Sequence, residues 1–254
     1  MDGVTTSMPS SASDPSAGRK PKASARRHVI SELEQLVFTQ FEPGTALPSE
    51  SELAERYGVS RLTVREATKH LEARGLIEIH HGRRPVIARP NAGPIRDFFT
   101  AAVRRDPRGL LDLLEVRRAL EVSMARAAAA RASRTAITAM ESALEAMKNS
   151  GDDGSAFHDA DVRFHESLAD ATGNQTLTLL LEALEGPLRL SRIQSFEGHL
   201  MRGLGADEVI SQHERILDRV REHDAAGAAD AMRAHLLSTE QDLRARLVAD
   251  QDQI

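Results

Sequence analysis

Apolar residues recur at helical spacing along most of this 254-residue chain. The first such segment covers residues 26–41, and Pro43-Gly44 follows it as a helix stop. Five apolar side chains on one face predict a helix that packs into a core: Val29, Ile30, Leu33, Leu36 and Val37. Residues 1–25 show no such period and are rich in Ser, Pro, Ala and Gly, so we expect a disordered tail there.

Two short helices are predicted after this segment. Ser49 and Glu52 have the Ser-x-x-Glu spacing of a capping box, so a helix should begin at Glu50. Ser60 is expected to cap the next helix, and Gly75 lies where a glycine should end it. A turn of only a few residues therefore joins the two helices.

The second of these helices has two distinct faces. Its apolar residues recur at helical spacing and should face a core: Val64, Ala67 and Leu71. Its cations recur every four residues and should form a stripe on a different face: Arg61, Arg65 and Lys69. A helix anchored by its apolar side, with a cationic stripe outward, is typical of the recognition helix of a helix-turn-helix.

Two short strands are predicted next, at residues 76–79 and 86–88. The turn between them, residues 80–85, is basic, with Arg83 and Arg84 near its tip. This pattern predicts a wing, a hairpin beside the recognition helix. Residues 26–90 are therefore expected to form a winged helix-turn-helix domain.

The rest of the chain is predicted to be helical. Residues 91–107 read as a linker with a short helix near residues 95–104, because the stretch contains several Pro and Gly. The helices predicted beyond it cover residues 108–130, 133–149, 154–172, 174–191, 203–223 and 224–249. Gly186-Pro187 and Gly198 are among the expected breaks. An inner apolar face on each helix predicts an antiparallel α-helical bundle over residues 108–250, so the fold class is mainly α.

Composition narrows the possible partners and compartment. The net charge is −5, but residues 1–90 carry 13 Lys/Arg against 11 Asp/Glu and the remainder carries 20 against 27. Binding to nucleic acid would therefore depend on a local cationic face. The chain has no Cys, which excludes disulfides and thiolate metal sites. No signal-peptide or membrane-spanning run is present, so we expect a cytoplasmic protein without a membrane partner.

A second group of residues has the chemistry of a metal site. Asp161 and His165 stand at i and i+4 on one helix face, and His213 and His235 lie on two later helices. One carboxylate and three imidazoles suit a divalent ion such as Zn²⁺, Ni²⁺ or Mn²⁺. Spacing alone does not select these four among ten histidines, since His158 shares the face of Asp161 and His223 is also near. The alternative is a set of ordinary surface and core histidines.

The N-terminal motifs closely resemble the winged helix-turn-helix of GntR-type bacterial transcription regulators. The matching residues are Leu47-Pro48-Ser49-Glu50, Leu53-Ala54, Gly58-Val59-Ser60-Arg61, Val64-Arg65-Glu66-Ala67, Leu71, Gly75-Leu76 and His81-Gly82. The resemblance implies a homodimer that binds a palindromic double-stranded DNA operator. It assigns DNA contacts to Ser49, Ser60, Arg61, Thr63, Arg65, His81 and Gly82.

The chain departs from that family at three places. Many members carry Arg where this chain has Ser51, and a small polar residue is common where it has Leu62. The wing continues as Arg83-Arg84-Pro85 instead of a second glycine-rich turn. The operator sequence therefore does not follow from the resemblance.

Residues 109–247 look like the helical C-terminal effector-binding (FCD) domain of the FadR-like branch of these regulators. Matches include Leu114-Glu115-Val116-Arg117, Asp161-Val162-Arg163-Phe164-His165, Gly173-Asn174, His213 and Ala231-Met232-Arg233-Ala234-His235-Leu236. The resemblance implies that Asp161, His165, His213 and His235 bind a metal that helps to hold a small organic acid. It also implies that Arg117 binds the carboxylate of this effector. The alternative for Arg117 is a helix-surface ion pair with Glu121 at i+4.

These observations predict a ligand-responsive transcription regulator, which we expect to be a repressor and not an enzyme. Its effector would be a small carboxylate, such as a sugar acid or a hydroxy or keto acid. One alternative is a metal-free regulator that senses a fatty-acyl or other apolar effector. A more distant one is a metal-dependent hydrolase, although the sequence shows no nucleophile elbow, phosphate loop or general base beside the ligand set.

Overall fold

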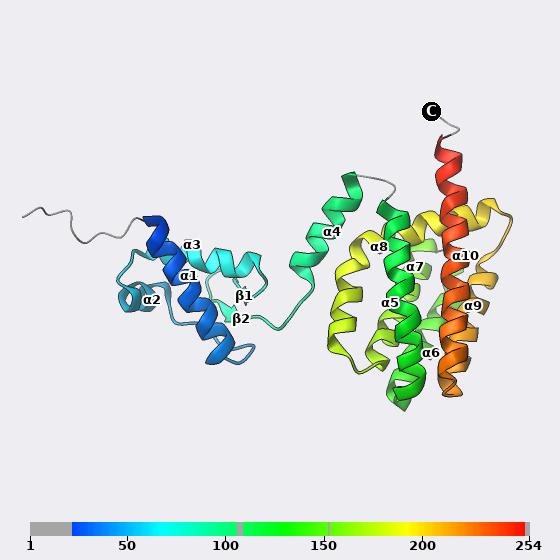
Figure 1. The fold of residues 1–254 in the computed structure, drawn as a ribbon, viewed down its shortest axis with the longest axis horizontal. Coiled ribbons are helices and arrows are strands. Elements are labelled where there is room, and N and C mark those ends of the chain that lie inside the picture. Colours follow the sequence, from blue (N-terminus) through cyan, green and yellow to red (C-terminus); the bar gives the residue numbers. More distant parts are fainter. Residues whose placement is uncertain (1–21, 106–108, 152, 252–254) are drawn as a thin grey trace, which may run out of the picture. The chain divides into compact units, whose positions relative to one another are not determined.

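The computed structural model of the protein describes residues 22–105, 109–151 and 153–251. It divides into two compact units, Met1–Pro90 and Asn91–Ile254 (Figure 1). Residues 1–21 of the predicted disordered tail, and Arg108 at the predicted start of the bundle, lie outside the described residues. Within these described ranges, no helix is both long and apolar enough to cross a membrane.

The first unit contains three helices and a two-stranded hairpin. The elements are α1 (Lys22–Thr39), α2 (Glu50–Tyr57), α3 (Arg61–Ala73), β1 (Ile77–Glu78) and β2 (Val86–Ile87). The strands are antiparallel, with Ile77 opposite Ile87, and are shorter than predicted. Helix α1 begins four residues inside the stretch that we expected to be disordered, and it ends two residues before the predicted end. The order of elements is that of a winged helix-turn-helix.

Local signals fix the ends of α2 and α3. Ser49 and Glu52 form the predicted capping box, in which each side chain accepts the backbone N–H of the other residue. Gly58 ends α2 in the left-handed region at φ 62°, which an L side chain rarely adopts. The side chain of Ser60 accepts the N–H of Thr63 at 3.1 Å and caps α3. The apolar face of α3 is completely buried, as predicted, in the core shared with α1.

The second unit is a helical bundle. Its helices are α4 (Gly93–Arg105), α5 (Gly109–Arg131), α6 (Arg134–Lys148), α7 (Gly154–Ala171), α8 (Gln175–Met201), α9 (Ala206–Arg221) and α10 (Ala225–Gln251). Helix α4 is longer than the short linker helix that we predicted, and it packs along α8 within this unit. Helix α10 packs against α5, α8 and α9. Helices α6 and α7 pack against each other and complete the bundle through contacts of α7 with α5 and α8 and of α6 with α9 (Figure 1).

Helix α8 differs most from the sequence prediction. We expected breaks at Gly186-Pro187 and at Gly198, but the helix continues through both to Met201. Pro187 removes one backbone hydrogen bond, yet it is buried, and its neighbours Leu184 and Leu188 lie in the core. Gly198 lies where α8 crosses α10, because a Cβ there would stand 2.8 Å from the carbonyl carbon of Asp242 and closer still to its oxygen. The glycine allows close packing and does not end the helix.

We therefore expect Gly198→Ala to destabilise the bundle by about 1–3 kcal/mol, the usual effect of overpacking. Urea unfolding followed by circular dichroism measures this change. Gly154→Ala is the matched control, since nothing lies within 4 Å of a Cβ at that helix start, and its stability should change by less than about 1 kcal/mol. Equal stabilities for the two variants would contradict the assigned role of Gly198.

Candidate functional site

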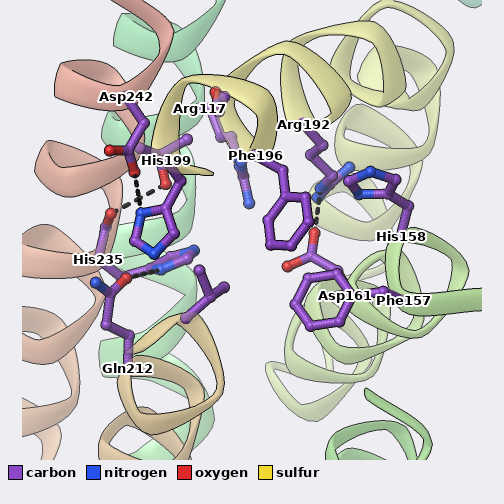
Figure 2. Close-up of a pocket in the computed structure, with 13 residues that line it drawn as sticks. Arg117, Phe157, His158, Asp161, Arg192, Phe196, His199, Gln212, His235 and Asp242 are labelled. Atoms are coloured by element: carbon purple, nitrogen blue, oxygen red, sulfur yellow. Dashed lines mark hydrogen bonds and ion pairs between the residues drawn. The ribbon is translucent and has the colours of Figure 1, made fainter. Parts of the chain in front are cut away.

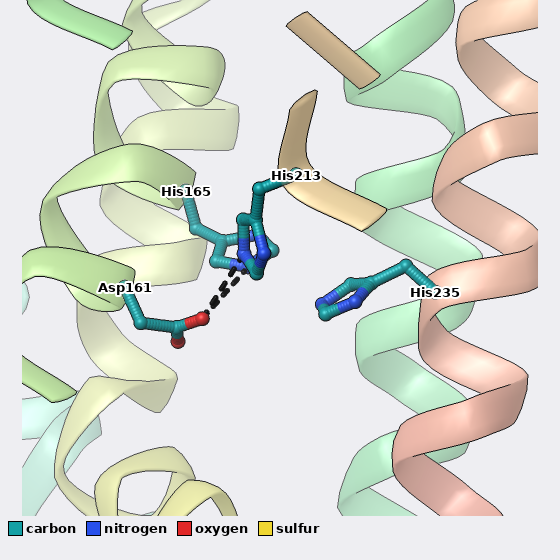
Figure 3. A group of neighbouring side chains, drawn as sticks. All are labelled: Asp161, His165, His213 and His235. Atoms are coloured by element: carbon teal, nitrogen blue, oxygen red, sulfur yellow. Dashed lines mark hydrogen bonds and ion pairs between the residues drawn. The ribbon is translucent and has the colours of Figure 1, made fainter. Parts of the chain in front are cut away.

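Four buried side chains meet inside the bundle. Asp161 and His165 come from α7, His213 from α9 and His235 from α10 (Figure 3). One ligand atom from each lies within 4.8 Å of the others. Nε2 of His213 is 3.0 Å from Oδ1 of Asp161 and 3.3 Å from Nε2 of His165. The structure thus brings together the four residues that the sequence and the resemblance selected.

Each of the three imidazoles is oriented by an oxygen atom at its Nδ1 nitrogen. The oxygens are the backbone carbonyl of Val209 for His213 (2.8 Å), the side-chain oxygen of Gln212 for His235 (2.8 Å) and the carboxylate of Glu121 for His165 (2.5 Å). Because a carbonyl oxygen only accepts, the Nδ1 of His213 and of His235 carries the proton. The Nε2 lone pairs therefore face the shared space, and Nε2 of His235 has no hydrogen-bond partner. This arrangement is the one that supports imidazole ligands of metal ions.

The surroundings of the four-residue group shift the pKa values of its members toward the forms that can bind a cation. Burial lowers the pKa of His165 to about 4. Burial, together with the neighbouring His213 and His165, holds the pKa of His235 well below its usual value. For Asp161, burial would raise the pKa, but the positive charge of the neighbouring Arg192 outweighs this effect and holds the pKa of the carboxyl well below its usual range. At neutral pH the site therefore offers the carboxylate of Asp161 and the neutral imidazoles of His165 and His235, which are suitable ligands for a divalent cation.

Arg117 is buried beside this group. Only 1% of the residue is exposed, and its Nε donates to Oε1 of Glu121 at 2.5 Å. The pair with Glu121 forms as in the alternative interpretation, but the expectation of a surface position was wrong because α5 lies against the other helices. The NH2 group of Arg117 also lies 2.9 Å from Nε2 of His165. One lone pair cannot accept this bond and bind a cation, so the two interactions exclude each other at His165.

The sequence reasoning missed two further residues of this network, Arg192 and Glu185. Nε of Arg192 lies 2.6 Å from Oδ2 of Asp161, and its NH1 donates to Glu185 at 2.8 Å. The guanidinium thus holds the second oxygen of Asp161 while the first faces the imidazoles. Our predicted helix ended at residue 191, which placed Arg192 outside the bundle. Helical spacing from Leu181, Leu184 and Leu188, continued through Pro187, was the available signal.

A polar cavity adjoins the four-residue group (Figure 2). Thirteen residues line it, and only Phe157, Phe196 and Val209 are apolar. Arg117, Asp161 and His235 belong both to this lining and to the network described above. The NH2 of Arg192 and the hydroxyl of Ser195, which also lines the cavity, are buried without a hydrogen-bond partner among the described residues. The cavity therefore suits a ligand with several hydrogen-bonding groups.

The remaining candidate histidines are engaged elsewhere. His158 lines the cavity and packs edge-on against Phe196, and burial lowers its pKa. His223 donates from Nδ1 to the carbonyl of Ala129. His199, which the sequence reasoning did not single out, has Nδ1 3.0 Å from Asp242 and Nε2 3.1 Å from the Gly205 carbonyl. None of these three joins the four-residue group.

The first unit exposes the cations that the sequence assigned to the recognition helix. Arg61, Arg65 and Lys69 are all exposed on α3. Arg65 forms a two-point ion pair with Glu50 of α2, with Nε–Oε1 at 2.9 Å and NH2–Oε2 at 2.7 Å. This pair fixes the direction of the Arg65 guanidinium although its side chain is 57% exposed.

The remaining residues assigned to DNA lie at helix starts and on the wing. The hydroxyls of Ser49 and Ser60 cap α2 and α3, and the Thr63 hydroxyl lies 2.9 Å from that of Ser60. Free N–H groups and the helix dipole at such starts favour anions. His81 and Gly82 are exposed at the wing tip, where Gly82 has φ 71°.

Comparison with known families covers both units. The family model described as "Bacterial regulatory proteins, gntR family" matches residues 25–87. The model described as "FCD domain" matches residues 112–238, half of the chain. The four-residue group and Arg117 all lie within the second match.

Relatives and solved structures agree with these matches. The chain is 33% identical over 219 residues to the HTH-type transcriptional repressor NanR of Enterobacter sp. (strain 638), covering 83% of this chain and 82% of the relative. It is 30% identical over 222 residues to the galactonate operon transcriptional repressor of Escherichia coli (strain K12), covering 86% and 96%. The structure of Streptococcus agalactiae GntR superposes with a TM-score of 0.66 at 26% identity, covering 85% of this chain and 99% of that one.

The buried ion pairs predict a large effect of Glu121→Ala on stability. The change would leave the Arg117 guanidinium buried without its carboxylate, which typically costs about 3–5 kcal/mol. Glu240→Ala is the control, because Glu240 pairs with Arg118 and Arg244 at the surface and such pairs contribute about 0–1 kcal/mol. Chemical unfolding of both variants measures their free energies of unfolding, and similar losses would show that the Arg117–Glu121 pair stabilises the protein no more than a surface pair does.

Proposed function

The chain belongs to the GntR family of bacterial regulatory proteins and carries an FCD domain, and from this premise we propose that it is a transcriptional repressor whose helical unit binds a divalent metal ion and a small polyhydroxy monocarboxylate. The observation that carries the proposal is the orientation of the three imidazoles, whose Nδ1 atoms are held by oxygens while their Nε2 atoms face the Asp161 carboxylate. Mixed nitrogen and oxygen donors suit Zn²⁺, Ni²⁺ or Mn²⁺.

Asp161, His165, His213 and His235 would hold the ion. When bound, the ion would act as a Lewis acid that attracts the effector's carboxylate. Arg192 orients Asp161 through its second oxygen, and Glu121 orients His165. Two carboxylates, Asp161 and Glu185, share the single guanidinium of Arg192, so the local charge favours a cation.

The cavity supports a hydroxylated effector. A fatty-acyl chain would have to displace water from buried charged groups without replacing their hydrogen bonds, which is unfavourable. Hydroxyl groups would instead satisfy the NH2 of Arg192 and the hydroxyl of Ser195, which have no partners among the described residues. Arg117 would bind the carboxylate with its guanidinium. One relative is named for the galactonate operon, and galactonate is a polyhydroxy monocarboxylate.

The first unit would bind the operator. Exposed Arg61 and Arg65 on α3 would enter the major groove of DNA, and His81 and Gly82 of the wing would contact the neighbouring backbone. A homodimer would present two copies of α3 to the two half-sites of a palindrome. An effector with different affinities for two arrangements of the dimer would then shift its affinity for the operator, and a coupling of about 1–3 kcal/mol is enough.

The metal assignment predicts that His213→Ala lowers the metal content of purified protein. Elemental analysis after dialysis against Zn²⁺, Ni²⁺ or Mn²⁺ measures this directly, and we expect about one ion per wild-type chain. His223→Ala serves as control, because His223 lies outside the four-residue group. Equal metal content in the two variants would refute the assignment. A wild-type protein that retains no metal would favour the metal-free alternative.

The effector assignment predicts that Arg117→Gln weakens the binding of aldonic acids such as galactonate at least tenfold, because a charge-assisted hydrogen bond contributes about 1.5–3 kcal/mol. Titration of the metal-loaded protein by calorimetry measures the affinity. Arg118→Gln is the adjacent control, since Arg118 pairs with Glu240 near the surface. Arg117→Lys, which keeps the charge near Glu121, separates a loss of recognition from a loss of folding. Wild-type affinity in both Arg117 variants would exclude this role.

The DNA model predicts that Arg61→Ala and Arg65→Ala each reduce operator affinity by about 1–3 kcal/mol. Fluorescence anisotropy with a duplex selected from a random pool by the wild-type protein provides the measurement. Arg74→Ala is the control, because Arg74 follows the other end of α3 and pairs with Glu34. If neither Arg61 nor Arg65 matters more than Arg74, α3 does not dock as described.

A further inference from the structure

Leu62 is exposed on the recognition helix without an apolar partner in the core. It is the second residue of α3, and 63% of it is exposed. Helix α3 is described over its whole length, and Leu62 is the one large apolar side chain that it exposes. An isolated surface leucine is common in proteins, so its position on the helix decides whether it has a role.

Helical geometry places Leu62 opposite the buried face. At about 100° per residue, its direction differs by roughly 170° from the average direction of the buried Val64, Ala67 and Leu71. Arg65 lies about 60° and Arg61 about 100° round the helix, both on the same side of Leu62. Leu62 is therefore the first-turn residue that points most directly away from the domain core.

The guanidinium of Arg65 is held to one side of Leu62. Arg65 is fixed by its two hydrogen bonds to Glu50 of α2, so its guanidinium does not cover Leu62. In a helix-turn-helix, residues at the start of the recognition helix reach the base edges. A leucine there has no hydrogen-bonding group, whereas a phosphate or a base edge with donors and acceptors requires one.

We propose that Leu62 reads the 5-methyl group of a thymine in each half-site of the operator. This methyl is the apolar feature of the major groove, and it distinguishes thymine from the other three bases. Leu62 would add an apolar contact on one side of the polar readout by Arg61 and Arg65. The proposal rests on the docking of α3 proposed above, which the Arg61→Ala and Arg65→Ala titrations test separately.

Replacing thymine by deoxyuridine tests this contact, because it removes only the methyl group. Each thymine of the selected duplex is replaced in turn, and binding of the full-length protein is titrated. We expect one symmetry-related pair of thymines at which uracil weakens wild-type binding about fourfold per half-site and about fifteenfold for both, the equivalent of about 0.8 kcal/mol per methyl. Leu62→Ala should bind the thymine duplex more weakly by a similar factor and should not distinguish uracil from thymine at this pair.

Phe38→Ala is the matched control, because Phe38 is a similarly exposed apolar residue of α1, and it should keep the wild-type sensitivity to uracil. Alanine favours helix, and circular dichroism checks that Leu62→Ala retains its fold. Leu62→Met, which keeps an apolar side chain, should retain most of the sensitivity to uracil. Two results would overturn the proposal: a wild-type protein that is indifferent to every uracil, or a Leu62→Ala variant that remains as sensitive as the wild type.

Discussion

The candidate metal site in the helical unit depends on how the imidazole rings of His165, His213 and His235 are held. A histidine inside a protein presents two nitrogens, and only the one without a proton binds a cation. Here an oxygen stands at the Nδ1 of His165, His213 and His235, which leaves the other nitrogen of each ring toward Asp161. Two of these oxygens, from Gln212 and Val209, come from α9, and the third comes from Glu121 on α5. The packing of α5, α7, α9 and α10 therefore also determines how the rings at this candidate site are oriented.

The sequence predicted the parts of the structure that depend on neighbouring residues. The Ser49–Glu52 capping box, the buried face of α3 and the shared helix face of Asp161 and His165 each depend on residues no more than a few positions apart. Such contacts follow from helical spacing alone. Spacing could not choose among ten histidines, because the choice depends on which side chains the packing of α7, α9 and α10 brings close together. The family resemblance made that choice, and the structure places the four side chains close together.

The residues that were missed depend on tertiary packing. Gly186-Pro187 and Gly198 look like helix breaks by local propensity, but burial of the flanking leucines and the close approach to α10 outweigh that propensity. Because the predicted helix ended at residue 191, Arg192 and Ser195 could not be placed in the cavity from the sequence. Arg117 shows the same limit, since an i, i+4 ion pair looks identical in sequence whether it is exposed or buried.

The crossing at Gly198 also limits how this protein can evolve. Backbone atoms of α10 face Gly198 there, so any larger residue at this position would force the two helices apart. The crossing therefore restricts position 198 to glycine, whereas a side chain that lines the cavity, such as that of Ser195, is not subject to this restriction.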